Sequence, residues 1–138
     1  MSDYIEVLAK AAKQERVVVN KALDEALTAL DDELAELADA LKVEYVGPRV
    51  GVDAGTDAYA LVVRAHEWEI GKFTWSMKVC DATPAGQLRA TWPVQGTGRR
   101  RKVLIIAVLA EFFAGFKAAV EAAGQSNARL DALCEAFA

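Results

Sequence analysis

The sequence predicts a single α+β domain, because its apolar period changes from helical to alternating and back to helical. Residues 1–42 carry apolar residues every three or four positions, residues 43–95 alternate, and residues 98–138 are helical in pattern. A chain of 138 residues that is 54% hydrophobic has the size and composition of one domain with one core. We therefore expect a long N-terminal helix, a four-stranded antiparallel meander, a buried helix on the sheet and a short C-terminal helix.

The N-terminal segment has no glycine or proline before Gly47, and Ser2 stands where an N-cap residue would. One helix of about 40 residues would be about 60 Å long, which is more than a small domain can cover. Leucines spaced alternately by four and three residues predict a homodimer interface. This stripe consists of Leu23, Leu27, Leu30, Leu34, Leu37 and Leu41. Packing of the same stripe on the chain's own sheet is the alternative. A break into two helices is also open, because Val17, Val18 and Val19 are β-branched and weaken helix propensity.

The middle segment predicts four strands, near residues 43–52, 59–65, 73–79 and 88–92. Gly47 and Pro48 interrupt the first, as in an edge or bulged strand. Alternation predicts one apolar face, which contains Tyr59, Leu61, Val63, Phe73, Trp75, Met77, Val79 and Trp92. We expect Trp75 and Trp92 to pack on this face against the helix that carries Ile105, Leu109 and Phe112. A cavity for an apolar ligand on this face is the alternative to a filled core.

The opposite face of the sheet carries polar residues. By parity these are Arg64, His66, Lys78, Cys80, Arg89 and Thr91. One hypothesis is a Cys80–His66 nucleophile and base oriented by Glu67 or Glu69, and the alternative is that His66 is a solvated turn residue. One histidine and two widely separated cysteines do not predict a metal site. No catalytic residue, metal or cofactor is therefore assigned.

The C-terminal segment predicts a buried helix that is apolar on more than one side and ends near Ala123. Gly124 follows as a C′ residue. Ser126 is expected to cap a last helix, which buries Leu130, Leu133 and Phe137.

The start of this buried helix is glycine-rich and basic. The residues concerned are Gly96, Thr97, Gly98, Arg99, Arg100, Arg101 and Lys102. Cations in a first turn oppose the helix dipole, so helix stability does not explain them. They predict an anion site that combines backbone N–H groups with the arginines. The alternative is pairing with acidic residues of the first helix, namely Asp31, Asp32, Glu33, Glu36 and Asp39.

This loop resembles the pyrophosphate loop of the N-acetyltransferase superfamily. Gln95, Gly96, Thr97 and Gly98 follow a predicted strand and precede a long helix, as in that family. The resemblance implies an acyl-CoA ligand and an acyltransferase-like activity.

The net charge and the first residues of the chain restrict the classes of function that we expect. A net charge of −4 does not favour binding to nucleic acid, and no signal peptide or CxxC pair is seen, so we expect a cytoplasmic protein. Glu111 and Lys117 interrupt the apolar run from Val103 to Val120, so no membrane span is predicted. We expect a non-enzymatic protein-interaction or regulatory module, with itself (as a homodimer) or another protein as partner. The alternative is a protein that binds a small anionic ligand, a nucleotide or acyl-CoA, through residues 96–102, with an acyltransferase-like protein as a third hypothesis.

Overall fold

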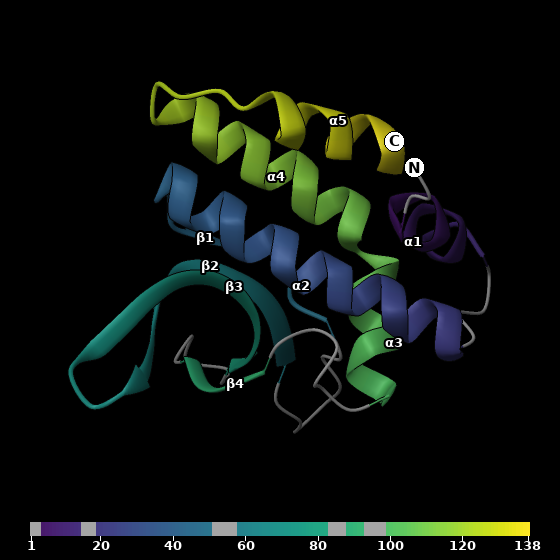
Figure 1. The fold of residues 1–138 in the computed structure, drawn as a ribbon, viewed down its shortest axis with the longest axis horizontal. Coiled ribbons are helices and arrows are strands. Elements are labelled where there is room, and N and C mark those ends of the chain that lie inside the picture. Colours follow the sequence, from purple (N-terminus) through teal and green to yellow (C-terminus); the bar gives the residue numbers. More distant parts are fainter. Residues whose placement is uncertain (1–3, 15–18, 51–57, 83–87, 93–98) are drawn as a thin grey trace.

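The computed structural model describes residues 4–14, 19–50, 58–82, 88–92 and 99–138, with the side chains of residues 58, 68, 81, 82, 88–92 and 99–101 excepted. Within these ranges the chain combines helices with one antiparallel sheet, which confirms the α+β class (Figure 1). The helices are α1 (Tyr4–Ala12), α2 (Lys21–Leu41), α3 (Arg99–Ala107), α4 (Leu109–Ala122) and α5 (Ala128–Phe137). The strands are β1 (Tyr45–Val46), β2 (Ala58–Glu69), β3 (Lys72–Ala82) and β4 (Leu88–Trp92).

The N-terminal segment forms two helices, so the prediction of one long helix is wrong and the alternative of a break is confirmed. The first helix ends at Ala12 and the second begins at Lys21. Asn20 caps α2, since its side-chain oxygen accepts a hydrogen bond from the backbone N–H of Leu23 at 2.9 Å. The break lets α1 fold back against α2 and bury Ile5 and Leu8. Ser2 lies outside the described residues.

The leucine stripe of α2 lies in the core of the chain. All six leucines are buried, and α2 packs on β3 more extensively than any other helix packs on the sheet. Packing on the chain's own sheet therefore accounts for the stripe. A homodimer interface made of these leucines stays a prediction, and it would require the core to open.

The sheet has the strand order β1-β2-β3-β4, with every neighbouring pair antiparallel. The strand expected near residues 43–52 is reduced to the two residues of β1 and a single bridge between Val50 and Tyr59. The β2–β3 hairpin is longer than expected and turns at Gly71, whose φ of 78° suits glycine. Figure 1 shows this hairpin as an arch, with α2 and α4 on its convex side.

The apolar face of the arch packs on the helices, as predicted for most of its residues, but the helix that covers it most is α2 and not, as predicted, the helix that carries Ile105, Leu109 and Phe112. Leu61, Val63, Met77 and Val79 are buried in the main core, and Trp75 packs against it. The prediction for Phe73 is wrong, because it lies near the hairpin tip, beyond the helices, and is 60% exposed. Trp92 pairs with Val79 in the backbone register, but its side chain lies outside those that are described.

The helix expected from residue 98 onward is divided at Val108 into α3 and α4. The buried apolar residues of these helices form one broad stripe, which consists of Ile105, Ile106, Leu109, Phe112, Phe113, Phe116 and Val120. The prediction of burial on more than one side is wrong, since the other side carries exposed small residues such as Ala107, Ala110 and Ala114. Alanine raises the apolar count without needing burial.

The C-terminal helix α5 closes the helical layer. Gly124 has a φ of 78° after α4, and Leu130, Leu133 and Phe137 are buried, as predicted. Its N-cap is Asn127 and not Ser126, because the Asn127 side chain accepts from the backbone N–H of Leu130 at 2.9 Å.

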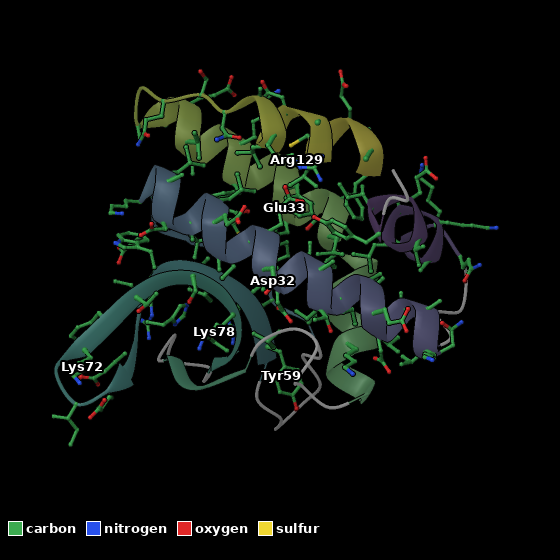
Figure 2. All side chains as sticks on the ribbon, in the orientation of Figure 1. Asp32, Glu33, Tyr59, Lys72, Lys78 and Arg129 are labelled. Atoms are coloured by element: carbon green, nitrogen blue, oxygen red, sulfur yellow. The ribbon has the colours of Figure 1, made fainter. Side chains whose placement is uncertain are left out.

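A polar link joins three helices on the outer side of this layer. Glu33 on α2 accepts hydrogen bonds from Tyr4 of α1 and from Arg129 of α5, and Figure 2 shows Glu33 and Arg129 turned toward each other. Among the described helices, none combines the length and apolarity needed to cross a membrane.

Candidate functional site

Most of the loop predicted to bind an anion lies outside the described residues. Gly96, Thr97 and Gly98 lie outside the described residues, as do the side chains of Arg99, Arg100 and Arg101. Lys102 is described, and its Nζ lies 2.9 Å from a carboxylate oxygen of Asp24 on α2, with little of the lysine side chain exposed. For Lys102 the structure shows the pairing alternative, with an acid that sequence reasoning did not name. Anion binding by the rest of this loop stays a prediction.

The polar face of the β2–β3 hairpin is the stronger candidate. The register pairs Ala60 with Cys80, Val62 with Lys78, Arg64 with Ser76, and His66 with Thr74. These residues share the face that points away from the main core, as parity predicted for Arg64, His66, Lys78 and Cys80. Ala60, Val62 and Cys80 form a small buried apolar cluster at one end of this face. The face therefore has an apolar end and a polar end.

At the polar end, three buried side-chain atoms have no hydrogen-bond partner within the part of the chain that the structure describes. They are Nε of Arg64, Nδ1 of His66 and Oγ of Ser76. Arg64 and Ser76 lie directly opposite each other, so their Cβ atoms are about 5 Å apart, and His66 is a diagonal neighbour of Ser76 at about 7–8 Å. We define Arg64, His66, Ser76 and Lys78 as the sheet-face cluster. Buried polar atoms are nearly always paired, so three unpaired atoms on adjacent positions make this cluster the candidate site.

His66 is held in one orientation by its own strand. Its Nε2 lies 3.0 Å from the backbone oxygen of Val62, four residues earlier in β2. The carbonyl can only accept, so Nε2 carries the proton and donates. A neutral imidazole in this tautomer leaves a bare lone pair on Nδ1. The hydrogen bond also draws the ring back along the strand toward Arg64 and Lys78.

The environment of His66 keeps it neutral. Burial is the largest effect and lowers the pKa of His66, while the hydrogen bond to Val62 opposes this shift. The positive charges of Arg64 and Lys78 lower the pKa of His66 further. His66 is only 2% exposed, so its unpaired Nδ1 is shielded from bulk water. At neutral pH the site therefore presents one acceptor, His66 Nδ1, beside two cations.

The lowered pKa of His66 makes the stability of the folded protein depend on pH. Because the folded-state pKa of His66 lies below the unfolded value, its contribution is fully present above about pH 6.5 and is lost as the pH falls through the folded pKa. We expect the free energy of unfolding to fall between about pH 7.5 and 5.5, by up to about 1.4 kcal/mol per unit of pKa shift. Urea denaturation at several pH values measures this. His66→Phe should remove the part of this pH dependence that comes from the histidine. If the free energy of unfolding of that variant depends on pH as in the wild type, His66 is not the group responsible.

The structure does not bring the proposed Cys80–His66 pair together. Six residue positions of the ladder separate Cys80 from the pair formed by His66 and Thr74, which amounts to roughly 20 Å along the strand. Glu67 accepts from the backbone N–H of Gly71 at 3.1 Å, and Glu69 pairs with Lys72 at 3.2 Å, so both carboxylates are engaged at the hairpin tip. The dyad hypothesis is wrong. The solvated-turn alternative for His66 is wrong as well, because the residue is buried within β2.

Sequence reasoning found three members of the sheet-face cluster but missed Ser76. The signal was available, since Ser76 shares parity with Lys78 in β3. Arg89 and Thr91 cannot be added, although Thr91 pairs with Cys80 in the backbone register, because their side chains are not described. No group of three or more residues suited to hold a metal ion occurs in the described part of the chain.

Comparison with known proteins gave no relative: no family model, curated protein or solved structure matches this chain.

Proposed function

We propose that this protein binds a small anionic ligand through the sheet-face cluster. The observation that supports this is the set of three unpartnered buried atoms of Arg64, His66 and Ser76 on adjacent positions of one sheet face. A buried polar group without a partner costs about 1–3 kcal/mol, and more if it is charged. A ligand that pairs with all three would recover this cost on binding.

Charge favours an anion over a neutral ligand. Arg64 and Lys78 flank His66, and no ion pair found among the described residues involves either of them. A buried water could satisfy the three orphaned atoms, but it would leave both positive charges uncompensated. An oxyanion satisfies the donors and the charges together, and an arginine N–H to an oxyanion is among the stronger protein hydrogen bonds.

Access to the cluster is from its cationic side. Arg64 and Lys78 are partly exposed and Thr74 is exposed, whereas His66 and Ser76 are buried. Figure 2 shows Lys78 within the arch of the hairpin. An anion would meet the two cations first and then reach the buried histidine and serine, which is the order that favours electrostatic steering.

Titration calorimetry with inorganic phosphate tests the proposal. We expect Arg64→Gln and Lys78→Gln each to weaken binding by about tenfold or more, because a hydrogen bond to a charged group is worth about 1.5–3 kcal/mol. The matched control is Lys72→Gln, which removes the same charge from the same strand at the hairpin tip. Absence of phosphate binding to the wild type at millimolar concentration would contradict the proposal, and so would equal losses in the site variants and the control.

Protein association as a homodimer is a second candidate, through the hairpin tip instead of the leucine stripe that the sequence predicted. The hairpin tip favours it, because Ile70 is 96% exposed and Phe73 is 60% exposed, which is unusual for side chains of this size. Light scattering at tens of micromolar should show a dimer in the wild type and a monomer in the Ile70→Ser, Phe73→Ser double variant. A monomeric wild type would remove this candidate.

A further inference from the structure

We infer that the ligand of the sheet-face cluster is an oxyanion that also carries a neighbouring O–H group, and not a fully deprotonated anion. This inference rests on the proposed function and narrows it to a class of ligand. Two kinds of molecule share this chemistry, namely monoprotonated phosphates and α-hydroxycarboxylates.

The free donors and acceptors of the cluster determine what the ligand must offer. Nε2 of His66 already donates to Val62, so the lone pair of Nδ1 can only accept. Nε of Arg64 can only donate, and the Ser76 hydroxyl can do either. The ligand must therefore offer acceptor oxygens to Arg64 and one donor to His66. A fully ionised oxyanion has only lone pairs, so it would place an oxygen lone pair against that of Nδ1.

Burial makes this mismatch costly. His66 is 2% exposed and Ser76 is 9% exposed, so water cannot readily supply the missing donor. A site whose buried polar group is left unpaired rejects the wrong ligand far more strongly than a site that merely loses an apolar contact. The cluster should therefore distinguish two anions of similar size and shape by one proton.

Two matched pairs of ligands test the inference by titration calorimetry. Phosphate and sulfate are both tetrahedral, but at about pH 7.5 only phosphate retains an O–H. Glycolate and acetate are both carboxylates, but only glycolate has a hydroxyl group beside the carboxylate. In the pair that resembles the natural ligand, we expect the protonated or hydroxylated member to bind about tenfold more tightly or better. Which pair shows this difference distinguishes a phosphate from a hydroxycarboxylate.

The pH dependence provides a second readout in the wild-type protein. Among the described groups, Arg64 from β2 and Lys78 from β3 are the charges that face His66. Protonation of His66 turns Nδ1 into a donor. The preference for phosphate over sulfate should therefore shrink as the pH falls. His66→Phe should remove the preference at every pH.

The outcomes separate this inference from the proposed function. If phosphate and sulfate bind equally, and glycolate and acetate bind equally, the inference is overturned while anion binding stands. If none of the four binds, the proposed function fails first. Should His66→Phe not fold, the wild-type pH series still decides once it extends below the pH at which the His66 ring becomes protonated, since a preference that survives this protonation would contradict an acceptor role for His66.

Discussion

Replacing Phe112 by alanine should lower the free energy of unfolding by about 3–5 kcal/mol, a large part of the stability of a domain of this size. Phe112 is fully buried on α4 and lies where three aromatic rings meet. Its ring centroid is 5.6 Å from that of Tyr45, 5.4 Å from Phe113 and 6.1 Å from Phe116. The ring also lies so close to Gly47 that a Cβ there would be 2.6 Å from its Cδ1. Its loss would leave a cavity between the helices and β1.

Urea denaturation measures this effect, and the hairpin tip supplies the control. Ile70→Ala removes a comparable apolar volume from a side chain that is 96% exposed, so it should change the free energy of unfolding by no more than about 0.5 kcal/mol. Equal losses in Phe112→Ala and Ile70→Ala would show that the core is not where the structure places it.

Replacing Gly115 by alanine should destabilise the protein by about 1–3 kcal/mol, even though alanine is the better helix former. Gly115 lies in α4, and a Cβ there would overlap with the Tyr45 hydroxyl and lie 2.6 Å from the ring carbon that bears it. Tyr45 is itself fixed by contacts with Phe112 and Phe116. The glycine therefore provides the space that lets β1 pack against α4.

A double-mutant cycle tests whether the cost of Gly115→Ala depends on the side chain of Tyr45. In a Tyr45→Ala background the overlap is gone, so Gly115→Ala should become stabilising by up to about 1 kcal/mol through helix propensity. The effect of Gly115→Ala must change sign between the two backgrounds. Destabilisation of the same size in both would contradict close packing between Tyr45 and Gly115.

The sequence predicted the faces of the hairpin better than the ends of the helices. Apolar and polar residues alternate clearly in β3 from Lys72 to Val79, and each residue of a strand has only two choices of face, so Arg64, His66 and Lys78 could be assigned by parity alone. The apolar pattern continues across Val108, however, and nothing local separates α3 from α4 there. Helix breaks of this kind depend on tertiary packing, which period alone does not report.

The site itself could be predicted only in part. Parity placed a histidine beside two cations, but it could not show that His66 is buried or that its ring turns back toward Val62. That orientation decides which nitrogen is free. The exposure of Phe73 was missed for a related reason, since the hairpin extends beyond the helices that cover the rest of its apolar face.

The state of the His66 ring during ligand binding tests the central claim most directly. His66 is the chain's only histidine, so a ¹⁵N-histidine-labelled sample gives one pair of imidazole nitrogen signals. At about pH 7.5 we predict a neutral ring with the proton on Nε2, and a shift of the unprotonated Nδ1 signal on titration with phosphate or glycolate. The same titration of Arg64→Gln should show a much weaker response. A proton on Nδ1, or an Nδ1 signal that stays unchanged at millimolar concentrations of both ligands, would contradict ligand binding at the sheet-face cluster.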